Sequence, residues 1–342
     1  MKHLLKEMKD RARYMAEDNK AFHDFVNQSL EAYLDGGEQE FTYRYFVNEK
    51  VGNRSFSVGI TDLLSEKINE IPQAVLDYHR NPSEANFISL INCYYMEVLT
   101  LMTGYMQKTV VPAHMDMTIS SAGLLALGFF GPEEQNMVMN YLRFYLDNQI
   151  REFEQNENPA VKRCFGASSV MPLYILLSRN HSESEPAVRS FEGHLDGNMK
   201  PLNPVIEHNL NPVYAYAYEH YLSDDEAAVT KLFQDLGDYH RDHCRKDSKT
   251  FYVFDSFEWR YLPAEMLCLL KLRMNRHKSI DFISHPLIDP FKPYLKLDSA
   301  LLLSETSLRL KREIMRRSGI KGRSEFNRIN RYLEALFCVH NT

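Results

Sequence analysis

The chain has 342 residues, and its 40 lysines and arginines against 46 aspartates and glutamates give a formal net charge of −6. Hydrophobic residues make up 44% of the sequence and aromatic residues 12%, which is enough for a large core and excludes a disordered chain. Glycine occurs only 14 times. Because glycine-rich sheets and phosphate loops need more of it, this composition favours helices.

The amino-terminal segment and the cysteines indicate a compartment. Residues Met1–Glu7 carry charges every few positions and lack the apolar run of about 7–15 residues that a secretion signal needs. The longest apolar stretches, Gly123–Phe130 and Ala264–Leu270, are too short to span a bilayer. The five cysteines fit neither a disulfide framework nor a CxxC metal site. We therefore expect a cytoplasmic protein with free thiols and no membrane segment.

Hydrophobic spacing predicts the elements of the first half of the chain. Apolar residues at three- and four-residue intervals predict helices, the first of which ends at Gly36. A β-hairpin is predicted over Phe41–Val58, where aromatic and β-branched residues flank a polar turn that contains glycine. Pro72 is expected to kink the next helix. The helices are predicted at Lys2–Leu34, Asp62–His79, Asn86–Gln107, Thr118–Phe130, Glu133–Phe153 and Pro159–Leu177.

A polar stretch with several glycines and prolines divides the chain. It predicts a linker at residues 181–203 between an N-terminal helical lobe of residues 1–180 and a C-terminal helical lobe of residues 204–342. Ser223 begins one helix, because a hydroxyl cap is followed three residues later by the carboxylate of Glu226. The helices of this half are predicted at Pro204–Tyr221, Ser223–Arg241, Phe257–Arg273, Ser299–Arg317 and Ser324–Phe337. The predicted fold is mainly α, an irregular stack of many helices in one or two lobes with the single hairpin.

The densest polar cluster lies at the predicted end of a second-lobe helix. On a helix, His240, His243 and Cys244 share one face and could hold one metal ion, and zinc favours such ligands. A structural zinc site needs a fourth ligand, for which only His220 or Asp247 is near in sequence. The favoured interpretation is a polar helix end, where histidines interact well with the last carbonyls. No metal or other cofactor is therefore predicted.

Two further groups invite a catalytic interpretation. His114 and Asp116 form a candidate general-base pair, and together with His240 and His243 they define one alternative function, a helical metal-dependent hydrolase. A helix cap at Asp116 or Thr118 is the simpler explanation of the same residues. The segment Gly166–Ser169 contains two serines, but the GxSxG elbow of serine hydrolases and the glycine-rich phosphate loops are both missing. We therefore predict a protein that is not an enzyme.

The stretch Arg309–Arg331 is strongly basic, with nine lysines and arginines against two glutamates. A basic strip on an acidic protein can bind phosphates or an acidic partner, so a nucleic-acid or regulatory binder is the other alternative function. Its candidate basic patch consists of Arg312, Arg316, Arg317 and Arg323. The stretch lacks a recognition-helix motif and interleaved aromatic residues, so nucleic acid is not favoured as a partner. Pairing with the protein's own acidic residues is the preferred interpretation.

Aromatic residues supply candidates for contact with a protein partner. The segment Phe251–Tyr261 contains the only tryptophan of the chain, and tyrosine, tryptophan and arginine dominate binding hot spots. We select Tyr239, Trp259 and Arg260 as candidate partner-binding residues. Burial of the same residues in the core is the alternative interpretation, and the favoured one.

Segments of the second lobe resemble a known family. Val229–Leu236, Tyr239–Cys244 and Phe257–Leu270 are similar to the cytoplasmic immunity proteins of bacterial polymorphic toxin systems, in particular the Imm49-type family and, more loosely, the helical immunity proteins of PoNe-type nuclease toxins. Ile283–Ile288 stands where a short closing segment of such a protein falls. The resemblance covers about 80 residues. It implies a helical, non-catalytic protein that occludes a cognate toxin, so it assigns no catalytic residues.

These observations lead to one hypothesis about function. We expect a stoichiometric protein-binding inhibitor, an immunity protein whose partner is a cognate protein toxin and which covers the active site of that toxin. The acidic first lobe is expected to face a basic nuclease groove, and complementary charge would speed association. The sequence leaves the oligomeric state open.

Overall fold

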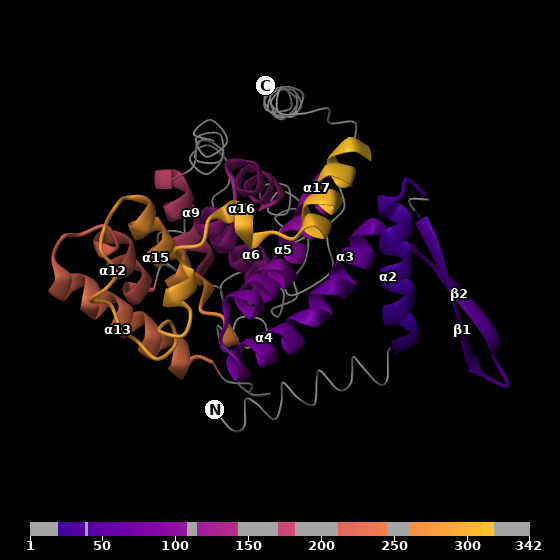
Figure 1. Ribbon diagram of the computed structural model, residues 1–342, viewed down its shortest axis with the longest axis horizontal. Coiled ribbons are helices and arrows are strands. Elements are labelled where there is room, and N and C mark those ends of the chain that lie inside the picture. The colour runs from indigo at the N-terminus through magenta and orange to yellow at the C-terminus, as the bar shows by residue number, and fades with distance from the viewer. Residues whose placement is uncertain are drawn as a thin grey trace, which may run out of the picture.

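The protein is mainly helical. The computed structural model describes residues 20–37, 40–107, 115–142, 170–181, 211–244 and 260–317. Within these ranges the chain forms a stack of helices and one two-stranded antiparallel hairpin (Figure 1). Both the predicted fold class and the hairpin predicted at Phe41–Val58 are therefore confirmed.

The elements follow one another in this order. The first half contains α2 (Lys20–Leu34), β1 (Glu40–Asn48), β2 (Gly52–Gly59), α3 (Ile60–Lys67), the 3-10 helix η2 (Ile68–Glu70), α4 (Ile71–Arg80), α5 (Glu84–Gln107), α6 (Met115–Phe129), a helical stretch at residues 132–142 and α9 (Val170–His181). The second half contains α12 (Pro212–His220), α13 (Glu226–Asp242), α15 (Ala264–Asn275), the 3-10 helix η3 (Lys292–Tyr294), α16 (Ser299–Leu302) and α17 (Glu305–Arg317).

Local sequence explains where the first helices end and begin. α2 ends just before Gly36, whose φ of 87° is a left-handed conformation that glycine adopts without strain. The helix predicted over Asp62–His79 is divided, because η2 joins α3 to α4 and Pro72 lies in the first turn of α4. Proline lacks an N–H and is tolerated in a first turn, so the expected kink is a new helix start.

Four predicted helices of the second half differ from the structure. α12 begins at Pro212 after the Asn211 cap, and the helix predicted over Phe257–Arg273 is interrupted at Leu262 and Pro263, before α15. Capping residues explain the other two differences. The helix predicted from Ser223 begins at Glu226, because the Asp225 carboxylate accepts hydrogen bonds at 2.9 and 3.2 Å from two N–H groups of the first turn. The helix predicted over Ser299–Arg317 is broken between α16 and α17. There the Ser304 hydroxyl accepts a hydrogen bond at 3.1 Å from a backbone N–H of the first turn of α17. In both cases a cap closer to the helix sets its start.

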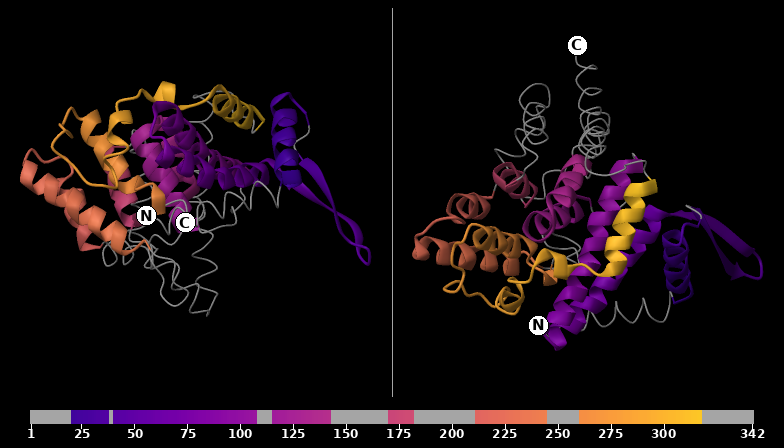
Figure 2. Two further views of the ribbon diagram at one scale, coloured as in Figure 1. Left: turned by 60° about the horizontal axis from the view of Figure 1, so that its bottom comes forward. Right: turned by 45° about the horizontal axis from the view of Figure 1, so that its top comes forward.

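The hairpin is a ribbon that stands away from the helices. β1 pairs with β2 antiparallel, with Tyr43 opposite Phe56, and the register shifts by a bulge between Phe46 and Asn48. Gly52 opens β2 with a φ of 71°, which suits a tight turn. Figures 1 and 2 show the ribbon pointing outward beyond α2, so only its base meets the rest of the molecule.

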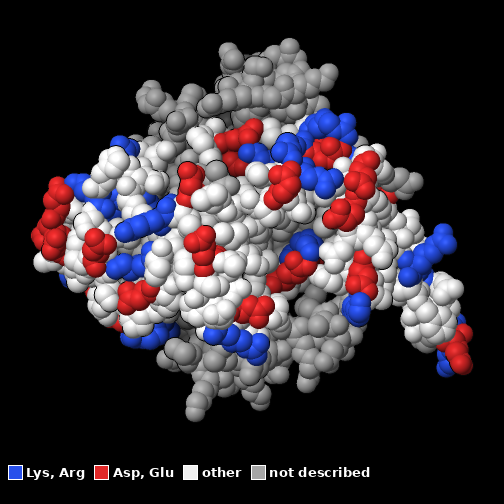
Figure 3. All heavy atoms as spheres, viewed as in Figure 1, with Lys and Arg blue, Asp and Glu red and all other residues white. Residues whose placement is uncertain are grey.

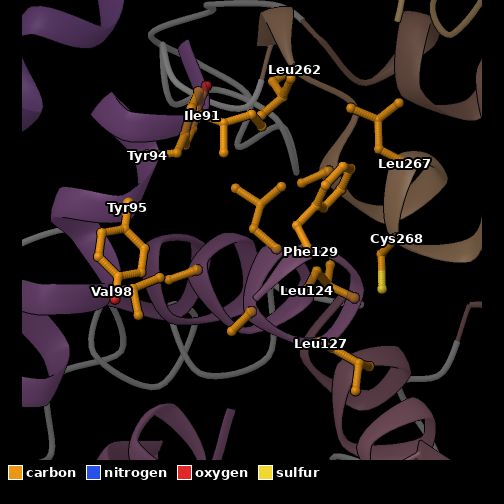
Figure 4. Close-up of a cluster of buried hydrophobic side chains, with 14 of the residues drawn as sticks. Ile91, Tyr94, Tyr95, Val98, Leu124, Leu127, Phe129, Leu262, Leu267 and Cys268 are labelled. Carbon is orange, nitrogen blue, oxygen red and sulfur yellow. The ribbon is translucent and has the colours of Figure 1, made fainter. Parts of the chain in front are cut away.

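The core centres on α5, which is buried along most of its length. α6 packs against α5, and α15 packs against α6. Figure 4 shows side chains of the three helices converging, among them Ile91 and Tyr94 of α5, Phe129 of α6 and Leu267 of α15. One continuous cluster of buried apolar residues contains members from both predicted lobes. The described residues of the two halves thus share a core.

Some predictions fall on residues that the structure does not describe. They concern residues 182–203 of the predicted linker, the first helix before Lys20, the last helix at Ser324–Phe337 and most of Pro159–Leu177. None of the described helices combines the length with the apolar character that a membrane span requires.

Candidate functional site

The junction of α13 and α15 contains a buried ion pair between His240 and Glu265. The imidazole Nδ1 of His240 donates a hydrogen bond to Oε1 of Glu265 at 2.7 Å, and both side chains are 1% exposed. Burial alone lowers the pKa of His240. The carboxylate of Glu265 and side-chain hydrogen bonds with Cys244 and Glu265 outweigh burial and raise it to about 9. At neutral pH the junction therefore holds an imidazolium against a carboxylate.

The other candidates of this region surround that pair. The His243 imidazole donates to the backbone carbonyl of Tyr239 at 2.8 Å and stacks on the Tyr239 ring, with 3.9 Å between centroids. The Cys244 thiol donates to the carbonyl of Arg260 at 3.5 Å. Arg260 is 6% exposed, and the Tyr239 ring meets that of Tyr214 edge to face. The structure thus brings these residues together, mostly in packed positions, with Tyr239 half-buried at the surface.

No metal centre is found in the part of the chain that the structure describes, because no three histidine, cysteine, aspartate or glutamate side chains are grouped to hold an ion. His240 is bound to Glu265, and His243 to a backbone carbonyl. Asp116 lies in the first turn of α6. The remaining candidates, His114, Gly166–Ser169, Trp259 and Arg323, lie outside the described residues.

The basic residues of α17 pair with carboxylates of the protein. Arg312 pairs with Glu305 at 2.6 Å, and Arg316 and Arg317 share Glu313 at 2.5 and 2.6 Å. Hydrogen bonds from Arg316 and then Arg317 lower the pKa of Glu313 to about 2. The described part of the predicted basic patch is therefore a self-paired helix face, as Figure 3 illustrates by its neighbouring blue and red groups.

α17 also ties the second half of the chain to the first. The guanidinium of Arg317 lies 4.0 Å from the ring centroid of Tyr33 and donates at 2.9 Å to the carbonyl of Gly37. Lys311 pairs with Glu134 at 2.5 Å, and the same carboxylate accepts a hydrogen bond from Tyr95 of α5 at 2.8 Å. These contacts give the charged residues of α17 a structural role.

A groove runs between α2 and the α4–α5 face. Two adjoining hollows of about 490 and 420 Å³ share Glu70, Ser89 and Cys93 in their lining. Lys67 pairs with Glu70 and compensates the charge at the centre of the groove, and the His23 imidazole lies 3.4 Å from the same carboxylate. Burial raises the pKa of Cys93 to about 12, so its thiol stays protonated at neutral pH.

The hairpin is the surface that sequence analysis did not select. Six large apolar side chains are exposed among the described residues, and all but one lie on the hairpin. Those on the hairpin are Tyr45, Phe46, Val47, Val51 and Phe56, and the sixth is Leu301 of α16. Phe46 is 62% exposed. Because scattered apolar side chains are ordinary but a contiguous patch marks a binding surface, this concentration makes the hairpin our candidate site.

The base of the hairpin packs against α2 through aromatic rings. The ring of Tyr43 lies 4.8 Å from that of Phe22 and 5.0 Å from that of Phe25, both on α2. Tyr43 also meets Phe56 at 5.6 Å and stacks on Tyr45 at 6.1 Å, which extends the aromatic row toward the tip. An isolated two-stranded ribbon is marginally stable in water. The cluster on α2 therefore supplies the support that lets the outer half remain exposed.

A signal for this surface is present in the sequence. Strand alternation predicts that one face of a hairpin is apolar and packed while the other is polar. In this hairpin Phe46 falls on the face opposite to Tyr43 and Tyr45, so aromatic residues occur on both faces. A two-stranded ribbon cannot bury both faces against one helix.

Comparison of the chain with protein-family models, with curated proteins and with solved structures finds no match.

Proposed function

We propose that this chain is a protein-binding inhibitor, and specifically an immunity protein that binds a cognate toxin and covers its active site. The observation that carries the proposal is the hairpin, which projects from the helices (Figure 2). Its exposed aromatic and aliphatic side chains lie on both faces and at the tip. Burying such side chains is the main favourable term in protein association.

The geometry of the hairpin suits a contact of this kind. Its base is fixed by the aromatic cluster with α2, so little conformational entropy is lost when its outer half is buried by a partner. A narrow ribbon also reaches into concave sites that a helix bundle cannot enter. Steric occlusion needs nothing more than a ribbon that fits and remains bound.

The resemblance to immunity proteins supports the finer part of the proposal. It lies in α13 and the region of α15, where His240 and Glu265 are buried against each other. In this proposal α13 and α15 belong to the supporting frame and the hairpin makes the contact. The half-buried Tyr239 remains a further candidate contact at the edge of the frame.

The test combines identification of the partner with a growth assay. A photo-reactive benzoylphenylalanine replaces Phe46 in the full, tagged chain, which is expressed in the organism that encodes it and irradiated. The same substitution at Leu301 is the matched control, because both side chains are 62% exposed and only one lies on the hairpin. A protein that is cross-linked from position 46 but not from position 301 is then expressed in a test host, with and without this chain.

The proposal expects growth arrest by the partner alone and recovery when the wild-type chain is present. Phe46→Ser should lose most of the protection, whereas Leu301→Ser should keep it. A partner that does not impair growth would refute the toxin-neutralising role. Protection that is unaffected by Phe46→Ser would remove the hairpin from the contact.

A further inference from the structure

We infer that the outer half of the hairpin docks into an apolar depression rimmed by carboxylates on a protein partner. This inference rests on the proposed function, since it takes the hairpin as the contact surface, and it adds the chemistry of the partner's site. Its premises are the distribution of apolar side chains on the ribbon and the sign and pairing of its charges.

The exposed apolar side chains extend from the tip of the ribbon toward its base. Tyr45 and Phe56 lie on one face, with 5.9 Å between their ring centroids, and Phe46 lies on the opposite face, across from Asn53. Phe56 stands opposite Tyr43, nearer the base, and its ring lies 5.9 Å from that of Phe22 on α2. The bulge between Phe46 and Asn48 leaves Val47 outside the regular ladder. A ribbon that is apolar on both faces and at its end is buried best by a site that surrounds it. This favours a depression in the partner over a flat surface.

The outer half of the ribbon carries a net positive charge. Residues 44–54 contain Arg44, Lys50 and Arg54 against the single carboxylate of Glu49, which leaves a net charge of −8 on the rest of the chain. Figure 3 shows these basic groups along the hairpin and a mixed pair of charges at its tip. Arg44 and Arg54 are exposed, and neither forms an ion pair with a described residue.

Arg44 and Arg54 differ from the arginines of α17, which have carboxylate partners within the described part of the protein. Arg312, Arg316 and Arg317 are all paired with carboxylates of the protein itself. Arg44 and Arg54 instead flank the exposed aromatic residues, one on each face of the ribbon. A guanidinium forms two parallel hydrogen bonds with a carboxylate, which adds both energy and orientation. Carboxylates around the rim of the depression would supply the missing partners.

Two other modes of contact are less consistent with these features. Strand addition is disfavoured, because a bulge and charged side chains are the devices that protect sheet edges. Nucleic acid binds mainly through many phosphate contacts, whereas the outer ribbon offers three basic side chains beside a larger number of apolar ones.

The inference names a class of toxin. Active sites that cleave glycosidic bonds carry a pair of carboxyl groups without a bound metal ion to neutralise them. The ribbon carries charge of the opposite sign to such a site, and its apolar tip would displace water from it. This reverses the expectation that an acidic first lobe faces a basic groove, because the projecting part of that lobe is basic.

The experiment tests charge and location together. The full chain with benzoylphenylalanine at position 46 is prepared with its native charges, as Arg44→Glu/Arg54→Glu, and as Lys296→Glu, an exposed lysine between η3 and α16 that controls for charge reversal elsewhere. Each is irradiated in a lysate of the organism that encodes the chain, with and without nuclease treatment. The adduct is quantified, and the attached peptide is mapped by mass spectrometry. Equal melting temperatures establish that the variants are folded.

The expected result is one protein adduct that resists nuclease, whose yield falls at least tenfold with Arg44→Glu/Arg54→Glu and is unchanged with Lys296→Glu, as loss of charge attraction and new repulsion require. The attached peptide should lie in a concave site rich in aspartate and glutamate. The inference is overturned by no adduct, by an adduct with a second copy of the chain, by one that nuclease removes, or by attachment to a neutral or basic surface.

These outcomes are separable from failure of the proposed function. A partner with an acidic site that does not arrest growth sustains the inference and refutes the toxin-neutralising role. A toxin that the chain neutralises, but that is attached through a neutral or basic surface, refutes the inference and leaves the proposed function standing.

Discussion

The α13–α15 junction and the hairpin use similar residues in opposite ways. Both combine aromatic rings with charged side chains, yet His240 and Glu265 are buried against each other, whereas Arg44 and Arg54 stand in solvent. The difference follows from the elements that carry them. Two packed helices enclose the side chains between them, while a two-stranded ribbon has two faces and only one neighbouring helix. Composition alone therefore does not distinguish a packed junction from a contact surface.

The largest effect should come from breaking the buried pair. Glu265→Ala leaves the imidazolium of His240 buried without its carboxylate, and we expect the free energy of unfolding to fall by about 3–5 kcal/mol. Urea denaturation followed by circular dichroism measures this loss. Glu219→Ala, an exposed glutamate at the end of α12, is the matched control and should change stability by less than about 0.5 kcal/mol. Equal losses in the two variants would show that the pair is not buried as described.

The same pair predicts a dependence on pH. The pKa of His240 is raised from 6.5 to about 9 by folding, so its stabilisation is complete below pH 6.5 and is lost as the pH rises through 9. Between pH 6 and pH 10 this one group should remove roughly 3 kcal/mol from the free energy of unfolding. Denaturation at several pH values compares the wild type with Glu265→Gln. The loss should be much smaller in the variant, and parallel curves would contradict the assignment.

A smaller effect tests the packing around the junction. A Cβ added to Gly237 of α13 would lie 2.2 Å from the ring of His285, which is itself buried. Gly237→Ala should therefore destabilise the protein by about 1–3 kcal/mol, although alanine is the better helix former. Gly59→Ala, at the start of α3 with only an ordinary contact to Asp62, serves as the control. A Gly237→Ala variant as stable as the wild type would show that the ring has room to move.

Substitutions in the hairpin should destabilise the protein most at its base and least at its tip. Tyr43→Ala removes ring contacts with Phe22 and Phe25 and should cost about 1–2 kcal/mol of unfolding free energy. Phe46→Ser and its control Leu301→Ser should each change stability by less than about 0.5 kcal/mol. Thermal and urea denaturation of the three variants measures the gradient. A large loss with Phe46→Ser would indicate that the tip supports the fold.

Much of the fold follows from local sequence. Alternating aromatic residues predict the hairpin, and Pro72 predicts the break between α3 and α4. The hydroxyl of Ser223 predicts a helix start, but Asp225 stands nearer and caps it. Choosing between two adjacent caps depends on the direction in which the chain enters the helix, which distant packing sets. Such starts are therefore predicted within a few residues.

The site was less predictable because its contacts are distant in sequence. The histidine cluster at the end of α13 suggests chemistry, but only packing shows that Glu265, 25 residues away, holds His240. Arg273 resembles an ordinary basic residue near a helix end, yet it is buried and donates to the carbonyls of Tyr221 and Ser223 at 2.6 and 3.1 Å. The exposure of Phe46 likewise depends on distant packing, because it requires that no other described element lies over the outer half of the hairpin.

The contact of Arg317 with Tyr33 has a consequence for how the protein is made. The two residues are separated by 284 positions, and ribosomes add about 5–20 residues per second, so α2 waits about 15–60 s for α17 to be synthesised. During that interval Tyr33 and the neighbouring end of α2 are without their last helix. Translation speed over the second half of the message should therefore govern how long the nascent chain needs chaperone protection.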